Sequence, residues 1–280
     1  DRATLLTKPV IGFAGLTHLG LCSAAAAAAH GFDVVGFHDD EAVIGDLVSG
    51  HLPISEPGLA DAFSTNTARL RFSADAAALA ACDVVYIAVD VPTDEAGASD
   101  LRPITQMAKT AMEATSDNAL LVILSQVPPG FTRKIRCSPD RLYYQVETLI
   151  FGRGFERAMA PERIILGCAD PDAPLDARLK MHLEAFGCPI LPMRYESAEL
   201  AKISINMCLV ASIGVANTMA ELCEHVGADW SEIIPALRLD RRIGAYSYIS
   251  PGLGIAGGNL ERDLATVTRL ADTHGTDHGI

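Results

Sequence analysis

Residues 10–20 read VIGFAGLTHLG, a short apolar run followed by glycines at positions 15 and 20. The run at 10–14 predicts a buried strand, and the two glycines fit a tight turn from that strand into a helix. Residues 23–31, which contain six alanines and end in a glycine, predict the helix and its C-terminal end. A strand, a glycine turn and a helix in this order are typical of the first unit of a dinucleotide-binding fold.

Similar apolar runs, rich in β-branched residues, alternate with helical stretches along the first two thirds of the chain. This alternation is typical of a mostly parallel sheet with helices on both faces. The predicted strands are residues 10–14, 33–37, 69–73, 83–89, 120–125, 141–144 and 163–168. We therefore expect an α/β fold, in which residues 1–195 form a Rossmann-like domain with a doubly wound, mostly parallel sheet.

The chain after residue 195 has a different pattern. Residues 197 to about 226 contain no proline, and their apolar positions recur with helical period. They predict a single helix of about 30 residues and about 45 Å, ended by Gly227. Because a helix of this length exceeds the width of a small domain, we expect it to be the spine of a helical central domain over residues 196–280.

Two shorter segments complete the pattern of the C-terminal region. Residues 229–232, DWSE, have the form of a capping box and predict a helix from there to about Leu237. Residues 251–258 contain four glycines and predict a loop. Cys208 and Cys223, both on the long helix, are expected to pack in the core.

Composition disfavours several classes of protein. Hydrophobic residues make up 49% of the 280, enough for a substantial core, and no uninterrupted apolar run reaches the roughly 18 residues of a membrane-spanning helix. The net charge of -13 disfavours nucleic acid and anionic membranes as partners. The seven cysteines form no C-x-x-C pair and indicate neither disulfides nor a zinc site, so we predict no metal site. Free cysteines fit a reducing cytoplasm, and we predict no targeting signal.

The glycine turn departs from the G-x-G-x-x-G pattern of dinucleotide-binding proteins. Thr17 stands at the middle glycine, where its side chain is expected to crowd a bound pyrophosphate. The position after the second strand, where an acidic residue would hold the adenosine ribose, is His38. The motif alone therefore leaves two interpretations open, a dinucleotide site and a plain structural turn.

Further segments resemble the UDP-glucose/GDP-mannose dehydrogenase family, in the family's order and over nearly the whole chain. In the N-terminal part they are GHLPISEPGL at 50–59, the strand and acidic loop at 83–100, SQVPPG at 125–130, YQVE at 144–147 and PERI at 161–164. In the C-terminal part, residues 199–206 resemble E-x-x-K-x-x-x-N, and residues 252–263 resemble G-x-G-x-G-G-S-C-x-x-K-D. So many matches in one order identify the chain as a member of this family.

The resemblance implies a cofactor and a mechanism. In the family, two NAD molecules in succession each take one hydride from C6, the hydroxyl-bearing carbon of a nucleotide sugar, and a cysteine captures the intermediate aldehyde. The thioester formed next is hydrolysed with help from a Glu, a Thr, a Lys, an Asn and an Asp. The resemblance also implies a homodimer through the helix at 197–226. It further implies a third domain, for the nucleotide sugar, beyond Ile280, so the chain is either a fragment or natively short.

The residues carried over from the family match this mechanism only in part. The expected catalytic positions are Glu147, Lys202, Asn206, Asp263 and Asn259, the last standing where the family has its cysteine. The expected NAD-binding positions are Gly12, Gly15, Thr17, His18, Leu19, Gly20, His38, Val91 and Gln126. The expected substrate-binding positions are Gly257, Gly258 and Arg262. Further departures are Gln126 at the family's Thr, Arg262 at its Lys, and Ile150 and Phe151 at its Arg and Glu.

Two functions are compatible with these residues. Because an amide cannot form a thioester, the first is a divergent NAD-dependent oxidoreductase in which Lys202 and Glu147 support a single hydride transfer on a UDP- or GDP-sugar. The second is a catalytically silent paralogue that binds a nucleotide or a partner, which the departures at Thr17, His38 and Asn259 favour. Spacing alone would make Lys202 a solvated surface charge, whereas the apolar neighbours of Glu147 indicate an interior or cleft position.

Overall fold

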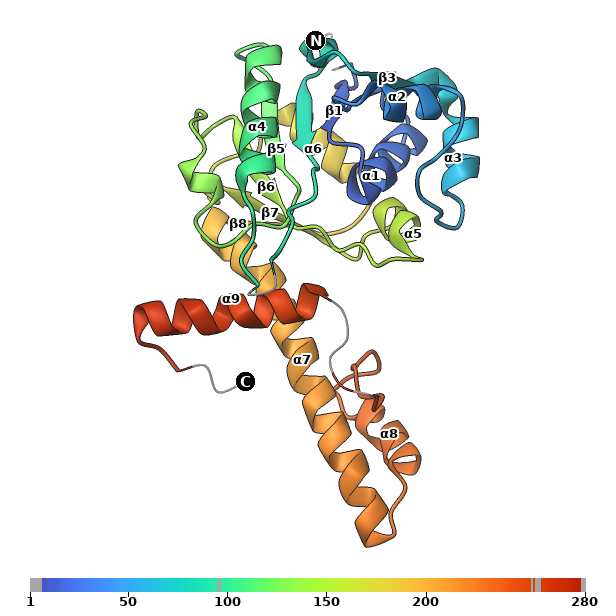
Figure 1. The fold of residues 1–280 in the computed structure, drawn as a ribbon, viewed down its shortest axis with the longest axis vertical. Coiled ribbons are helices and arrows are strands. Elements are labelled where there is room, and N and C mark those ends of the chain that lie inside the picture. Colours follow the sequence, from blue (N-terminus) through green and yellow to red (C-terminus); the bar gives the residue numbers. More distant parts are fainter. Residues whose placement is uncertain (1–6, 95–96, 253, 255–257, 278–280) are drawn as a thin grey trace, which may run out of the picture. The chain divides into compact units, whose positions relative to one another are not determined.

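The structure is a computed structural model that describes residues 7–94, 97–252, 254 and 258–277 (Figure 1). The chain divides into two compact units, residues 1–92 with 100–202, and residues 93–99 with 203–280. The expected domain boundary after residue 195 falls at the start of helix α7 (Tyr195–Val226), and the two units divide within that helix.

The first unit is built on a sheet of eight strands in the described residues, in the order β3-β2-β1-β4-β5-β6-β7-β8. The strands are β1 (Ile11–Ala14), β2 (Val34–Phe37), β3 (Leu70–Ser73), β4 (Val84–Ile87), β5 (Leu120–Ile123), β6 (Leu142–Gln145), β7 (Ile164–Cys168) and β8 (Ile190–Arg194). Strands β1 to β6 pair in parallel, β7 is antiparallel to β6, and β8 is parallel to β7. The mostly parallel, doubly wound sheet is therefore confirmed, with all seven predicted strands.

The sequence pattern does not predict the eighth strand, β8. Its sequence, ILPMR, contains Pro192, and Pro189 directly precedes it. Prolines argue against a central strand because they lack the backbone N–H that a neighbouring strand would bind. Strand β8 is at the edge of the sheet, beyond β7, where one side of the strand needs no partner.

The connections of the first unit place helices on both faces of the sheet. The helices are α1 (His18–Ala29), α2 (Glu41–Val48), α3 (Leu59–Thr65), α4 (Arg102–Ala114), α5 (Gly154–Met159) and α6 (Ala177–Glu184), with short 3₁₀ helices η1 (Thr67–Arg69), η2 (Ala76–Ala81) and η3 (Thr132–Lys134). Helices α1, α5 and α6 line a small cavity together with one face of the sheet. Helices η2 and α4 contact each other and cover the opposite face of the sheet, where right-handed crossovers place them. Alanines 24–28 of α1 are all buried, so this helix lies close to the sheet.

The second unit is helical, as expected. The C-terminal part of α7 is joined there by α8 (Trp230–Leu239) and α9 (Gly258–His274). Gly227 has φ +74° and ends α7, and the Asp229 side chain accepts a hydrogen bond from Ser231 N–H and caps α8. Both features were predicted, whereas α9 was not, because the glycine-rich stretch before it hides its start.

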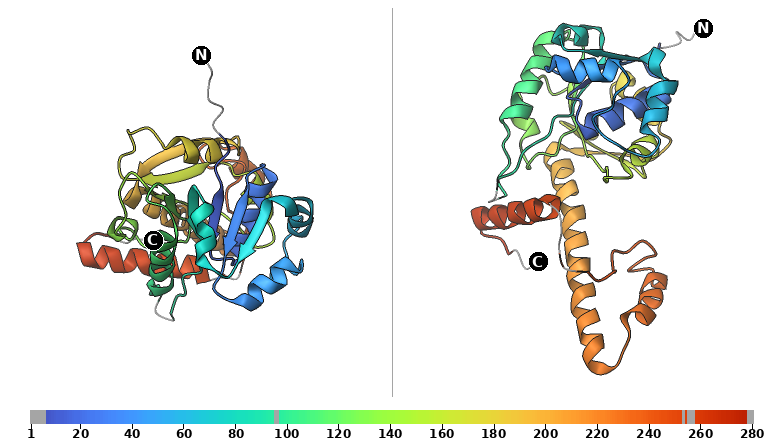
Figure 2. Two further views of the ribbon diagram at one scale, coloured as in Figure 1. Left: turned by 90° about the horizontal axis from the view of Figure 1, so that it is seen from above. Right: turned by 45° about the vertical axis from the view of Figure 1, so that its right-hand side comes forward.

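Two apolar clusters hold the helices of this unit together. Ile203, Met207 and Val210 of α7 pack against Leu260, Leu264 and Val267 of α9. Further along α7, Ala216 and Cys223 pack with Trp230 of α8 and with Ile249, whose carbonyl accepts a hydrogen bond from Trp230 Nε1 at 3.0 Å. Helix α8 thus folds back alongside α7 (Figure 2). Cys223 is buried as predicted, but the prediction for Cys208 is wrong, since Cys208 is exposed outside both clusters.

Helix α7 is the one helix of the described residues that is long and apolar enough to cross a membrane, by length and composition only. Its most apolar 18-residue window has a mean hydropathy of 1.5, and 33% of that window is buried inside the protein. The core helix of a soluble protein passes the same test, so this property alone is weak evidence for a membrane span.

A small cavity of about 60 Å³ lies between the sheet and helices α1, α5 and α6. His182 of α6 lines it and is surrounded by the rings of Phe32, Tyr86 and Phe186. His182 Nδ1 has no hydrogen-bond partner among the described residues. Burial among apolar rings, with a smaller contribution from the charge of His30, lowers the pKa of His182 to about 3.

This buried neutral histidine predicts an acid-sensitive fold. The unfolded chain takes up a proton at His182 below pH ~6.5, whereas the folded chain resists it down to about pH 3. The free energy of unfolding should therefore fall by up to ~1.4 kcal/mol per pH unit through this range. Urea unfolding at pH 7 and pH 5 measures this loss of unfolding free energy. In His182→Leu, the part of the loss that comes from protonation of His182 should disappear. The exposed control His51→Leu should keep the wild-type loss, and equal losses in all three proteins would contradict the assignment.

Candidate functional site

The turn between β1 and α1 requires glycine at two of the predicted positions. Gly15 has φ +104°, a left-handed conformation that favours glycine, and its N–H donates to the Phe37 carbonyl at 2.9 Å. A Cβ on Gly20 would lie 2.0 Å from the Gly15 carbonyl oxygen. Gly12 is not part of the turn but lies inside β1, where a Cβ would be 2.9 Å from Cys82 Sγ. The backbone of the turn therefore approaches α1 as a phosphate-binding turn does.

Thr17 stands at the N-terminal end of α1, at the position of the missing middle glycine. Its hydroxyl donates to the Ala88 carbonyl at 3.1 Å, beyond the end of β4. In the described structure the Thr17 side chain makes no capping bond to the first turn of α1. The N–H groups of that turn are thus not occupied by the Thr17 hydroxyl, and such groups are the usual ligands of a phosphate. Crowding of a pyrophosphate by Thr17 stays a prediction.

His18, the first residue of α1, binds a buried carboxylate. His18 Nε2 lies 2.6 Å from Glu56 Oε1, and the Glu56 side chain is only 2% exposed. The same carboxylate accepts the N–H groups of Gly152 at 2.8 Å and Gly154 at 2.9 Å. Burial by itself would raise the pKa of Glu56, but the hydrogen bonds from His18 and the two glycines outweigh it and lower the pKa below its ordinary value.

His38 follows β2, where the ribose of a dinucleotide would lie. Its Nδ1 accepts the backbone N–H of Asp40 at 3.1 Å, so the neutral ring carries its proton on Nε2. His38 therefore offers one donor at a position where a carboxylate would accept two hydrogen bonds.

Three further predicted cofactor residues lie after strands β4 and β5 or in helix α1. Val91 and Gln126 are half-buried and come after β4 and β5 respectively. Leu19 packs against the core of the first unit and lines the cavity under α1, so its side chain lies on the interior side of the helix.

Glu147 and Lys202 form an ion pair beyond the carboxyl end of β6. Lys202 Nζ lies 3.6 Å from Glu147 Oε2, and the two side chains are only 14% and 19% exposed. The other carboxylate oxygen, Oε1, accepts the N–H of Leu149. The interior or cleft position predicted for Glu147 is confirmed, and Lys202 is not the solvated surface charge that spacing alone would give.

The start of α7 brings Lys202 to this place. Tyr195, at the first residue of α7, donates its hydroxyl to the Leu142 carbonyl at 2.7 Å, at the beginning of β6. Seven residues later Lys202 meets Glu147, just past the end of the same strand. The first two turns of α7 therefore run along β6 towards the carboxyl edge of the parallel strands.

Glu199 lies between these two contacts and was not predicted as a site residue. Its carboxylate is fully buried and accepts the N–H of Gly130 at 2.5 Å and of Thr132 at 2.8 Å. Burial raises the pKa of Glu199, although the two backbone donors oppose the shift. The residue fixes the loop after β5 against α7. The only sequence signal was its place in the E-x-x-K segment, where it received no role.

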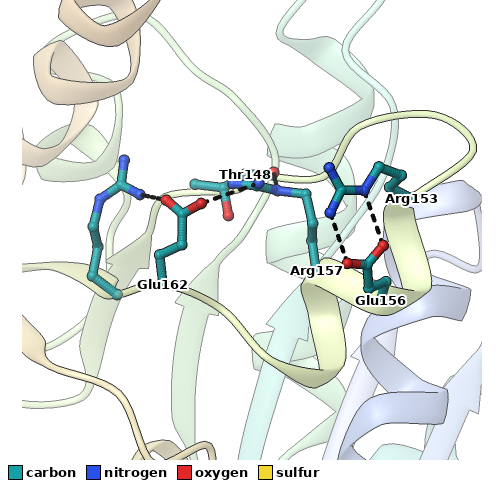
Figure 3. Close-up of polar contacts among 6 residues, drawn as sticks. Thr148, Arg153, Glu156, Arg157 and Glu162 are labelled. Carbon is teal, nitrogen blue, oxygen red and sulfur yellow. Dashed lines mark hydrogen bonds and ion pairs between the residues drawn. The ribbon is translucent and has the colours of Figure 1, made fainter. Parts of the chain in front are cut away.

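The loop after Glu147 is also held by a hydrogen bond from helix α5. Arg157 of α5 donates from Nε to the Thr148 carbonyl at 2.7 Å, and Glu162 lies 3.5 Å from Arg157 and 2.8 Å from Arg163 (Figure 3). Because Gly152 and Gly154 also donate their N–H groups to Glu56, the segment 148–154 is held at several points.

The second unit holds the remaining predicted catalytic residues. Asn206 Nδ2 donates to Asp263 Oδ2 at 2.5 Å, and Arg262 Nε lies 3.2 Å from Asp263 Oδ1. Asp263 and Asn206 are buried, whereas Asn259 is exposed in the first turn of α9. Gly258 is the first residue of α9, not the end of a loop, and Gly257 lies outside the described residues.

Most of the chain is similar in sequence to one known protein family. Residues 10–181 match the NAD binding domain of the UDP-glucose/GDP-mannose dehydrogenase family, and residues 196–280 match its central domain. The UDP-glucose 6-dehydrogenase TuaD of Bacillus subtilis is 32% identical over 277 residues, which cover 95% of this chain and 59% of that relative. The chain thus spans less than two thirds of the length of this relative.

Solved structures agree with the sequence comparison. A UDP-glucose dehydrogenase from the archaeon Pyrobaculum islandicum superposes with a TM-score of 0.85 at 29% identity, over 99% of this chain and 66% of that one. A UDP-D-ManNAc dehydrogenase from Pyrococcus horikoshii gives 0.82 at 24% identity, over 96% of this chain and 66% of that one, which supports the fold alone.

The residues of the first unit fit a dinucleotide such as NAD. The positions of Gly15 and Gly20 leave no room for a Cβ against Ala88 and the Gly15 carbonyl, so the turn is as tightly packed as a dinucleotide-binding turn requires. The N-terminus of α1 has N–H groups that can bind a phosphate, and His38 follows β2, on the side where the adenosine half of a dinucleotide would lie.

Proposed function

The chain belongs to the UDP-glucose/GDP-mannose dehydrogenase family, and from this premise we propose that it is an NAD-dependent oxidoreductase acting on the CH–OH group of a UDP- or GDP-sugar. The Glu147–Lys202 pair carries this proposal, because it sets a carboxylate and an ammonium together at the carboxyl edge of the parallel strands. Ligands of open parallel sheets bind at this edge.

The two residues have complementary roles in one oxidation. When bound, NAD supplies the acceptor for the hydride that leaves the carbon. The Glu147 carboxylate takes the hydroxyl proton, directly or through a water, as a general base. The Lys202 ammonium stabilises the negative charge that grows on the oxygen as the C=O bond forms. Neither step needs a thiol.

The family's second oxidation needs a covalent intermediate that this chain lacks the nucleophile to form. Asn259 stands at the position of the family's cysteine and is exposed in α9. None of the seven cysteines, all of them described, lies in residues 251–263. We therefore expect any turnover to stop after one hydride, at an aldehyde or ketone.

A catalytically silent paralogue is the second candidate function. Thr17, His38 and Asn259 depart together from the family at the pyrophosphate, the ribose and the nucleophile. The retention of two polar pairs argues against a silent paralogue. Glu147 and Lys202 form an ion pair in the first unit, and Asn206 and Asp263 form a hydrogen bond in the second. Drift without selection for catalysis would not spare both pairs.

Binding of NAD is the first test of the proposal. Because His38 donates one hydrogen bond where a carboxylate accepts two charge-assisted ones, we expect calorimetric titration to give a dissociation constant above 1 μM, roughly tenfold weaker than for a site with the acidic residue. His38→Asp is the informative variant and should tighten NAD binding. Submicromolar binding by the wild type, or a preference for NADP, would contradict this assignment of the turn.

The stoichiometry of NADH is the second test. With UDP- or GDP-sugars and excess NAD, the wild type should form at most one NADH per sugar oxidised, and Asn259→Cys should add a second or leave an aldehyde adduct visible by mass spectrometry. Asn259→Ser is the control, since its hydroxyl is a much weaker nucleophile. Two NADH per sugar from the wild type would refute the single-hydride proposal. NAD binding without any product or adduct in either protein would favour the silent paralogue.

We also propose a homodimer through the exposed face of α7. Within the second unit this face carries Cys208, Ala211, Val215, Met219, Leu222 and Val226, which are all exposed and recur with helical spacing. An apolar stripe of this kind is a liability unless it is covered.

Light scattering should give twice the monomer mass at micromolar concentration. Replacing Val215 and Leu222 together by Asp should return the protein to a monomer, because each buried interface would receive four charges without partners. Leu239→Asp, at an exposed apolar residue of α8, is the matched control and should stay dimeric. A wild-type monomer would exclude the dimer.

A further inference from the structure

Phe151 presents its ring to solvent in the segment that follows the carboxyl end of β6. The side chain is 78% exposed, and its ring centroid lies 4.4 Å from that of His18 at an interplanar angle of 35°. One face of the phenyl ring is therefore supported by an imidazole, while most of its surface stays uncovered. Single exposed apolar residues are common, so exposure alone assigns no role to Phe151.

What sets Phe151 apart is that its position is fixed. The buried Glu56 carboxylate holds His18 Nε2 at 2.6 Å, and it also holds Gly152 N–H and Gly154 N–H, just after Phe151 in the chain. The ring that supports Phe151 and the backbone that carries it are thus bound to one carboxylate. An aromatic group ordered before binding loses less conformational entropy when a ligand covers it.

The sheet topology says which part of a dinucleotide lies near Phe151. His38 follows β2 on one side of β1, whereas Phe151 belongs to the segment that follows β6, on the other side. In a doubly wound sheet the dinucleotide crosses the point where strand order reverses, with the pyrophosphate at the N-terminus of α1. The adenosine half then lies over β1 to β3, and the nicotinamide half lies towards β4 to β6.

We propose that Phe151 stacks on the nicotinamide ring of NAD, and that His18 and Glu56 are its positioning residues. This inference rests on the proposed NAD cofactor and adds a contact that the glycine turn does not provide. Offset aromatic rings attract each other, and the positive charge of the oxidised nicotinamide adds a cation–π contribution. Phe151 follows Glu147 by four residues, so the stack would hold the ring near the proposed general base.

The experiment separates the nicotinamide from the rest of the cofactor. Calorimetric titration of wild type, Phe151→Ala and Phe151→Tyr is carried out with NAD and with ADP-ribose, which lacks the nicotinamide. Phe151→Ala should weaken NAD binding by roughly 3- to 10-fold and leave ADP-ribose binding within about twofold, and Phe151→Tyr should bind both as the wild type does. Ile150→Ala is the matched control, because Ile150 is the exposed apolar neighbour in the same segment, and it should change neither affinity.

Proton NMR of the bound cofactor gives an independent readout. The ring current of Phe151 should move the nicotinamide proton resonances upfield at saturation with wild type and Phe151→Tyr, and this shift should be lost with Phe151→Ala. Equal weakening of NAD and ADP-ribose would overturn the proposal, since it would show a structural role for Phe151 in the loop. Unchanged NAD binding by Phe151→Ala would overturn the proposal as well. So would a Phe151→Ala variant that binds UDP-glucose more weakly than the wild type but binds NAD equally well. A wild type that binds neither NAD nor ADP-ribose would instead refute the proposed cofactor.

Discussion

The Glu56 carboxylate joins three segments that are far apart in the sequence. It comes from the connection between β2 and β3, it binds His18 at the start of α1, and it binds Gly152 and Gly154 in the connection after β6. A carboxylate at 2% exposure is stable only if its lone pairs are satisfied, and three donors do so here. Loss of the carboxylate would leave buried N–H groups unpaired, at about 1–3 kcal/mol each. The order of the glycine turn and of segment 148–154 therefore depends on the same group.

The reversal of direction at β7 is the second constraint on the site. Because β7 and β8 run against β6, the chain leaves β8 near the beginning of β6 and enters α7 there. Tyr195 fixes that start at the Leu142 carbonyl, Glu199 fixes the next turn to the loop after β5, and Lys202 then meets Glu147. If β7 continued parallel to β6, α7 would start at the carboxyl edge and carry Lys202 away from it. The antiparallel pair is thus what makes a lysine from the long helix available to the nucleotide-binding unit.

Local sequence patterns predicted most of the fold because strands, glycine turns and caps are decided by neighbouring residues. The strand at residues 10–14, the Gly227 stop and the Asp229 cap are of this kind, and all are confirmed. Strand β8 was missed because its prolines are tolerated only at a sheet edge, and edge position is a property of the whole sheet. Glu56 and His18 are 38 residues apart, and no local pattern connects them. Resemblance to the family supplied Glu147 and Lys202, but it gave no role to Glu199, whose burial shows only when α7 packs on the sheet.

The net charge of -13 raises the question of how this chain would hold an anionic dinucleotide. Charges further away than about 8 Å are screened at physiological salt, so the distant acidic residues slow the approach of an anion more than they weaken its bound state. Within that distance of the turn, Glu56 is a negative charge, but His18 and two backbone N–H groups direct their dipoles at it and it is withdrawn from solvent. The N-terminus of α1 adds partial positive charge on the outer side. Binding then depends on a few fixed donors and on shape, which is why an uncharged contact such as an aromatic stack would weigh heavily in a site where a histidine, not a carboxylate, follows β2.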